Sequence, residues 1–350
     1  MPGKRLWLKT PGMTTTQTML AVAISTPGSP DVLQQITIPV PASRPGEVLI
    51  RVAAAGVNAP DLAQRRGHYD PPPGASPLPG LEVSGVIAAL GPGASRHALG
   101  DRVVALCNGG GYAEFVAVPE GQVLPLPQNL GFTTGAALPE TYFTIQQTLI
   151  MKAGVSAGMS VLIHGAAGGL GGAGIVIASL YGASVFAVVS SEEKAVYARA
   201  LGAAAVIDRR DEDVVTRIKA LTDGRGVDRV VDIVGAATLA GSIAATAVEG
   251  HILVLATLAG AHAEINAGLI VGRRLTLHGS TLRPQTPATK AAIATSLMDK
   301  VWPALAAGKL PLPRLETFPL ADAALAHRSM EASQHFGKTV LVTDFGRQFA

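Results

Sequence analysis

Cysteine, aromatic residues and charges are all scarce in this sequence of 350 residues. Its single cysteine, Cys107, excludes a disulfide within the chain and favours a reducing compartment. The net charge of +3 is small and the basic residues are scattered, so no nucleic-acid partner is indicated. No uninterrupted apolar run of about 20 residues occurs, so we expect no membrane span and, by default, a cytoplasmic location.

Glycine and proline, in contrast, are abundant, with 40 and 24 residues. Residues 1–18 are basic at their start but lack the apolar core of a signal peptide, and we predict a flexible N-terminal tail there. Residues 19–140 contain short β-like runs, such as EVLIRVAAAGV and EVSGVIAALG, which glycine and proline separate at close intervals. This pattern predicts a compact, barrel-like β domain.

The pattern changes at about residue 141. Short, continuously apolar runs such as SVLIHG, ASVFAVV and DRVVDIVG alternate with stretches of helical spacing, which predicts a parallel sheet covered on both faces. Six such strands within residues 141–311 predict a doubly wound dinucleotide-binding domain, and therefore an α/β protein. The last strand-like run, GKTVLVTDF, follows the turn-rich GKLPLPRLETFP, and we expect residues 312–350 to rejoin the first domain.

A glycine-rich stretch, HGAAGGLGG at residues 164–172, joins the first strand of this second domain to its first helix. Glycine there permits a tight turn, lets the backbone approach a pyrophosphate, and leaves the N–H groups of the helix N-terminus for the anion. The spacing departs from strict G-x-G-x-x-G, and a plain tight turn would also explain it. The strand before it, the helix after it and the five further strands favour a dinucleotide site.

The end of the second strand indicates which dinucleotide binds. An NAD site usually places Asp or Glu there, about 20 residues after the glycines, whereas this chain has Ser190 and Ser191, followed by Lys194. Hydroxyls with a nearby cation suit the 2′-phosphate of NADPH, and Arg209 could supply a second cation. The glutamates at 192–193 argue against NADPH unless they form only the solvated first turn of a helix. We therefore predict NADPH, with an ordinary surface role for Lys194 as the alternative.

The order of a small β domain, then VLIHGAAGGLG, then a closing strand resembles the medium-chain dehydrogenase/reductases from residue 19 onward. The stretch NAPDLAQRRGHYDPPPGASPLPGLEVSGVIAALGPG is similar to their zinc-free quinone oxidoreductases, the zeta-crystallin-like family. Within that family it most resembles the branch of the tumour-suppressor-inducible NADPH quinone oxidoreductase. The resemblance implies a GroES-like catalytic domain beside a Rossmann domain.

Metal ligands are missing from the positions where the superfamily uses them. Zinc alcohol dehydrogenases carry a cysteine and a His-Glu pair where this chain has Asn58 and Leu81-Glu82, and their structural zinc needs four cysteines. Without clustered thiolate or imidazole ligands a catalytic zinc has nothing to bind, so we expect no metal. Hydride exchange with ordinary alcohols is then unfavourable. A quinone needs less help because its reduction delivers charge into a conjugated system.

The resemblance also implies individual site residues. Asn58 and Tyr69 match positions beside the nicotinamide and substrate, where Tyr69 either donates a hydrogen bond to a quinone oxygen or only lines the cleft. Thr144 matches a contact of the nicotinamide amide, and Lys194 matches the 2′-phosphate lysine. With the residues argued above, the predicted cofactor-binding set is Thr144, Gly165, Ala166, Ala167, Gly168, Gly169, Leu170, Ser190, Lys194, Arg209 and His335.

Three of these positions depart from the branch. Gly168 stands where the branch has a hydroxyl residue, which removes one possible cofactor contact. Arg209 stands where it has tyrosine, which keeps phosphate recognition but changes its geometry, and His335 stands where it has asparagine. Asp61 and Glu82 could be polar site residues, although turn and structural roles are favoured for both.

These features together predict an enzyme, an NADPH:quinone oxidoreductase that acts on a small-molecule quinone or another conjugated carbonyl. Reduction of an activated C=C bond in an enone, enal or enoyl thioester is an alternative from the same fold. A non-catalytic, NADPH-binding, crystallin-like protein is an alternative of another class. The resemblance also suggests a homodimer in which the RRLTLHGS strand pairs with its twin, because an exposed sheet edge has to be covered.

Overall fold

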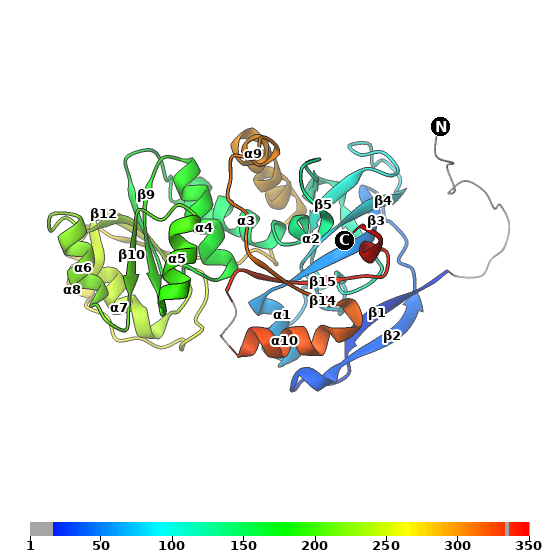
Figure 1. Cartoon of the computed structure of the whole chain (residues 1–350), viewed down its shortest axis with the longest axis horizontal. Coiled ribbons are helices and arrows are strands. Elements are labelled where there is room, and N and C mark those ends of the chain that lie inside the picture. Colours follow the sequence, from blue (N-terminus) through cyan, green and yellow to red (C-terminus); the bar gives the residue numbers. More distant parts are fainter. Residues whose placement is uncertain (1–16, 333–335, 350) are drawn as a thin grey trace.

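A computed structural model describes residues 17–332 and 336–349 of the chain. It shows two large sheets side by side, one at the left and one at the right of Figure 1, with helix α9 between them, and a separate two-stranded sheet. The tail predicted for residues 1–18 lies outside the described residues as far as residue 16. Its last residue, Thr18, already belongs to strand β1 (Thr18–Ile24).

The dinucleotide-binding half contains a parallel sheet of six strands in the order β10-β9-β8-β11-β12-β13. This is the strand order of a doubly wound fold, in which the direction of winding reverses next to the first strand. The predicted α/β fold class is therefore confirmed. The strands are β8 (Ser160–Ile163), β9 (Ser184–Val189), β10 (Ala205–Asp208), β11 (Val227–Asp232), β12 (Thr246–Val254) and β13 (Thr276–Gly279).

Helices cover both faces of this sheet. In β8, Val161 and Ile163 face a core that includes α4 and α5, whereas Leu162 faces a core that includes α6 and α7. Alternate residues of a strand point to opposite faces, so a strand buried on both faces is apolar throughout. The helices are α4 (Gly169–Leu180), α5 (Glu192–Ala200), α6 (Val214–Leu221), α7 (Ala236–Ala245) and α8 (Ala267–Arg273).

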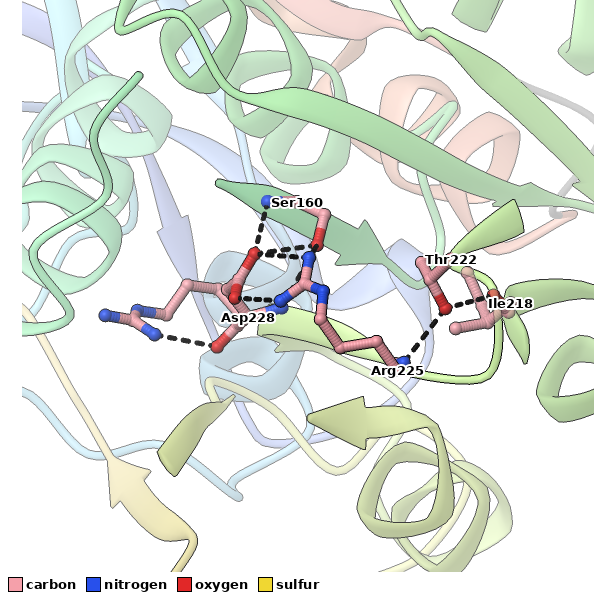
Figure 2. Close-up of polar contacts among 7 residues, drawn as sticks. Ser160, Ile218, Thr222, Arg225 and Asp228 are labelled. Carbon is pink, nitrogen blue, oxygen red and sulfur yellow. Dashed lines mark hydrogen bonds and ion pairs between the residues drawn. The ribbon is translucent and has the colours of Figure 1, made fainter. Parts of the chain in front are cut away.

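Polar contacts at the start of β8 and β11 tie these two central strands together (Figure 2). Asp228 Oδ2 accepts hydrogen bonds from the backbone N–H of Ser160 at 2.7 Å and from its hydroxyl at 2.8 Å. Arg225 donates to both Asp228 oxygens and to Ser160 Oγ. The turn before them is closed by Thr222, whose hydroxyl donates to Ile218 O at 2.7 Å. This anchor lies at the amino ends of the strands, whereas parallel sheets bind ligands at the carboxyl ends.

The other half is built on a seven-stranded sheet that takes strands from both ends of the chain. Strand β15 lies between β14, to which it is parallel, and β3, to which it is antiparallel. The segment after the nucleotide half therefore returns to the first sheet, as expected for GKTVLVTDF. The strands are β3 (Glu47–Val57), β4 (Glu82–Leu90), β5 (Arg102–Leu106), β6 (Phe115–Pro119), β7 (Val123–Pro125), β14 (Leu315–Pro319) and β15 (Lys338–Val342). A separate hairpin pairs β1 with β2 (Leu33–Pro39).

Strand β14 falls inside GKLPLPRLETFP, which we had described as turn-rich and in which we had predicted no strand. Its few residues are flanked by prolines, which hid the strand, and pairing with β15 is what orders it. The exact domain boundaries, 140 and 312, remain predictions.

Helices connect the two halves. Helix α3 (Pro139–Ile145) continues into the π-helix η3 (Gln146–Lys152), and α9 (Pro287–Ala306) packs against both and against the turn η2 (Glu120–Gln122). None of the helices within the described ranges is long and apolar enough to cross a membrane. The remaining helices and turns are η1 (Pro30–Val32), α1 (Ala59–Arg65), α2 (Phe132–Gly135), η4 (Leu320–Asp322), α10 (Ala323–Glu331) and η5 (Gly346–Phe349).

Candidate functional site

The glycine-rich stretch forms the turn between β8 and α4. Gly165 has a φ of +64°, in the left-handed region that glycine adopts without strain. Gly171 allows a close approach, because a Cβ added there would lie 2.4 Å from Gly165 O. Gly168 precedes the twelve-residue helix α4 as its N-cap, and an added Cβ there would meet only Gly165 O, at 3.4 Å. The helix N-terminus thus leaves free N–H groups beside open space, as an anion site requires.

A pocket of about 830 Å³ opens at this turn. Its lining contains most of the predicted cofactor-binding set: Gly165, Ala167, Gly168, Gly169, Ser190, Lys194 and Arg209. Thr144, Ala166 and Leu170 are not part of the lining. Ala166 is fully buried and donates its N–H to Val188 O at 3.1 Å, so it shapes the turn from below. The predicted residue His335 lies outside the described residues.

The far end of the pocket carries the two predicted cations. Lys194 Nζ lies 3.3 Å from Ser190 Oγ, at the end of β9, and Arg209 is exposed at the end of β10. Two acidic residues that the sequence analysis missed, Glu212 and Asp213, also line the pocket. Both have other partners: Glu212 pairs with an arginine of α6 at 3.2 Å, and Asp213 caps that helix. The glutamates at 192–193 do form the first turn of α5.

Asn58 lies in a buried polar network on the other side of the glycine turn. It is the N-cap residue of α1, where its backbone N–H donates to Asp61 Oδ2 at 2.9 Å. Its Nδ2 donates to Glu82 Oε1 at 2.8 Å, and its Oδ1 accepts from Lys338 Nζ at 2.6 Å. Lys338 also pairs with Glu82 at 2.5 Å. Sequence reasoning missed this lysine, whose only local signal is its place at the start of the last strand.

A catalytic zinc does not fit these residues. An amide at position 58, an aliphatic side chain at 81 and an ammonium beside Glu82 offer neither the thiolates nor the imidazoles that zinc prefers. Within the described ranges no group of three or more His, Cys, Asp or Glu side chains could hold a metal ion. The one cysteine, Cys107, is buried, and burial raises the pKa of its thiol, so it does not supply a thiolate.

Tyr69 is half-buried against a cation from the nucleotide half. The Arg283 guanidinium carbon lies 5.3 Å from the centre of its ring. Arg283 also donates to Asn108 O at 2.9 Å and to Gln64 Oε1 at 2.9 Å, which ties the chain after β13 to α1 and to the loop after β5. Lys290 donates to the Asn108 side chain and to Arg283 O. The Arg283 charge thus lies beside the Tyr69 ring.

Carboxyl groups with raised pKa values lie around the same junction. Burial raises the pKa of Asp61 to about 6, against hydrogen bonds from backbone N–H groups that lower it. Burial also raises the pKa of Glu140 to about 8, reinforced by the charges of Glu82 and Asp61. Thr144 lies one turn further along α3, and its hydroxyl donates to Glu140 O at 2.7 Å. Perturbed carboxyl groups of this kind are typical of functional sites, and nothing in the sequence pattern had indicated Glu140.

Comparison with known protein families matches both halves of the chain. Residues 44–128 match the family described as alcohol dehydrogenase GroES-like domain, and residues 169–298 match the family described as zinc-binding dehydrogenase. The second match includes neither Asn58 nor Glu82.

Individual relatives cover nearly the whole chain. The quinone oxidoreductase of Rattus norvegicus is 32% identical over 330 residues, 93% of this chain and 98% of that protein. A mycobacterial protein solved in complex with NADPH is 30% identical with a TM-score of 0.82, covering 93% of this chain and 100% of that one. The enoyl reductase CurK is 27% identical with a TM-score of 0.82, covering 93% and 99%.

The fold and the pocket thus define an NAD(P)-dependent oxidoreductase of the medium-chain dehydrogenase/reductase superfamily. Within that superfamily the chain belongs to the quinone oxidoreductase-like, or zeta-crystallin, family.

Proposed function

We propose that this protein is a zinc-independent NADPH:quinone oxidoreductase of the branch that contains the tumour-suppressor-inducible enzyme. The observation that carries the proposal is the set of side chains at the β9 and β10 end of the pocket. Lys194, Ser190 and Arg209 line it, and the acidic residue that would bind an NAD ribose is absent from the end of β9. A similar protein that was solved with NADPH supports the same cofactor.

The bound cofactor would supply a hydride, and NADPH, a quinone and one proton would give NADP⁺ and a hydroquinone. The N–H groups of the glycine turn would hold its pyrophosphate, and Lys194 with Arg209 its 2′-phosphate. Asn58 and Tyr69 would donate hydrogen bonds to the acceptor oxygen as it gains charge. Arg283, whose guanidinium lies over the Tyr69 ring, favours that charge by its position in a buried environment.

Reduction of an activated C=C bond is the second candidate, because the similar protein CurK is an enoyl reductase. Both reactions place negative charge on a conjugated oxygen, so the same donors would serve both. The two candidates therefore differ in the acceptor that is reduced and not in the cofactor pocket.

NADPH oxidation by the purified protein, measured against a panel of quinones, enones and crotonyl thioesters, tests the proposal. We expect turnover with quinones. Turnover with thioesters or enones alone would favour the second candidate. NADPH binding without turnover of any acceptor would leave only a binding protein.

We also propose that the protein acts as a homodimer through the edge of the nucleotide sheet. Strand β13 ends the strand order, and Leu277 on it is 37% exposed. Helix α8, which precedes this strand, has no buried residue, and Val271 on it is 77% exposed. An exposed apolar edge of this kind is a site for pairing with another strand, and a second copy supplies it by two-fold symmetry.

A further inference from the structure

One lysine joins the glycine turn to Asn58. The residue before it, Gly337, donates its N–H to Ala167 O at 2.9 Å. The stem of Lys338 crosses Gly169, where an added Cβ would lie 2.5 Å from Lys338 Cδ. Its Nζ then lies 2.6 Å from Asn58 Oδ1. The chain just before Lys338 is thus bonded to the predicted pyrophosphate turn, and the ammonium of Lys338 is bonded to the predicted substrate side.

The charged part of this contact is almost fully buried. Lys338 is 4% exposed, Asn58 6% and Glu82 0%. Removing two opposite charges from water costs about as much as their attraction returns, so stability alone is a weak reason for a buried ion pair. Glu82 is nevertheless well satisfied, since it accepts from Asn58, from Lys338 and from the Glu140 N–H at 2.9 Å. A complete network of this kind fixes the orientation of its members.

The orientation that it fixes is that of the Asn58 amide. An ammonium only donates and a carboxylate only accepts, so Lys338 has to face the amide oxygen and Glu82 has to face the amide nitrogen. Glu82 accepts one of the two Nδ2 hydrogens. Within residues 17–332 and 336–349 the second hydrogen donates to no backbone or side-chain acceptor, so the amide keeps one donor for a ligand.

We propose that Lys338 is a positioning residue, which holds the Asn58 amide so that its second N–H is available to the oxygen of the hydride acceptor. The inference rests on the proposed function for the nature of that acceptor. An amide turned by 180° would present Oδ1 instead and would repel an oxygen that gains negative charge. The ammonium on Oδ1 also polarises the amide and so strengthens its remaining N–H as a donor.

Charge-removing and charge-keeping variants test this role in turnover. We expect Lys338→Met, which keeps an unbranched apolar stem over Gly169, to lower kcat/KM for the acceptor by about tenfold to a hundredfold. Lys338→Arg should recover most of that loss because it keeps a cation. Lys219→Met is the matched control, since this half-buried lysine donates to the Gly224 carbonyl just after the end of its own helix, and its kcat/KM should match the wild type.

A double-variant cycle separates positioning from a general structural role. If Lys338 acts through Asn58, then Lys338→Met should cost less than about threefold in an Asn58→Ala background. An equal loss in both backgrounds would overturn the proposal. So would full activity of Lys338→Met in a protein with the melting temperature of the wild type.

A second measurement uses the free protein and no substrate. With ¹⁵N introduced only into asparagine, Asn58→Ala identifies the side-chain signals of Asn58 among those of Asn108, Asn129 and Asn266. We expect two well-separated, slowly interconverting amide protons in the wild type and in Lys338→Arg, and shifted or averaged signals in Lys338→Met. Unchanged Asn58 signals in Lys338→Met would overturn the proposal. A wild type that reduces no acceptor would instead overturn the proposed function, and the amide signals would still decide whether Lys338 holds Asn58.

Discussion

Replacing Lys194 with alanine should separate the two nicotinamide cofactors. The lysine lies at the end of the cofactor pocket, with its Nζ 3.3 Å from Ser190 Oγ. NADPH differs from NADH only by the 2′-phosphate that this end is predicted to bind. Loss of the ammonium should therefore weaken NADPH binding and leave NADH binding nearly unchanged.

The size of the effect follows from the position of the lysine. A charge-assisted contact to a phosphate contributes roughly 1.5–3 kcal/mol. Lys194 is of intermediate exposure, so solvent screening reduces that contribution. At about 1.4 kcal/mol for each tenfold change, we expect about tenfold to a hundredfold weaker NADPH binding.

Fluorescence titration of both cofactors measures the two Kd values. Arg210→Ala is the matched control, because its guanidinium is bound to Asp208 (Nη2 to Oδ2, 2.6 Å) rather than to the pocket, and neither Kd should change. Ser190→Asp should move the preference toward NADH, since the carboxylate repels the phosphate and accepts from the ribose hydroxyls.

Two results would refute the reasoning. If Lys194→Ala weakens both cofactors equally, the lysine supports the fold of the pocket rather than the phosphate. If the wild type already binds NADH more tightly than NADPH, the whole cofactor assignment is wrong.

Three further predictions concern metal, assembly and pH. Elemental analysis should find no stoichiometric zinc, and a chelator should leave activity intact, because Asn58 and Leu81 are not zinc ligands and Glu82 is paired with an ammonium; one zinc per chain would contradict this. Light scattering should show a dimer at micromolar concentration and a monomer for Leu277→Lys, which places a charge on the β13 edge; a monomeric wild type would count against the dimer. Since burial raises the pKa of Glu140 to about 8, kcat/KM should fall as the pH rises through that value and a carboxylate forms beside the acceptor. Glu140→Gln should lack this decline. If kcat/KM of Glu140→Gln falls with rising pH as in the wild type, Glu140 is excluded as the cause.

The dinucleotide-binding half could be predicted from local patterns. A strand buried on both faces is apolar at every position, as in β8, and the glycine turn after it is required by the φ of Gly165 and by the contact of Gly171. Both signals are complete within about a dozen residues of sequence. Strand β14 has no such local signal, because its five residues are ordered by pairing with β15, and it was therefore missed.

The substrate side could be predicted only in part. The resemblance indicated Asn58 and Tyr69, but their partners come from distant parts of the chain: Lys338 and Glu82 are 256 positions apart. Arg283 likewise reaches Gln64 from 219 positions away. No local pattern links such pairs, because a fold brings them together only after both halves are built. A family resemblance identifies single positions, whereas only the three-dimensional structure shows which distant residues contact them.

The return of β15 to the first sheet has a consequence for synthesis of the protein on the ribosome. Its neighbour β3 emerges nearly 300 residues earlier, since Thr343 and Val52, which share a hydrogen bond, are 291 positions apart. Until β15 arrives, the β3 edge next to it has unpaired N–H and C=O groups, and the Glu82 carboxylate lacks its ammonium. The sheet with the six parallel strands, in contrast, can close without any later segment. The predicted substrate side is therefore completed last, after the glycine turn and the sheet that carries it have formed in the nascent chain.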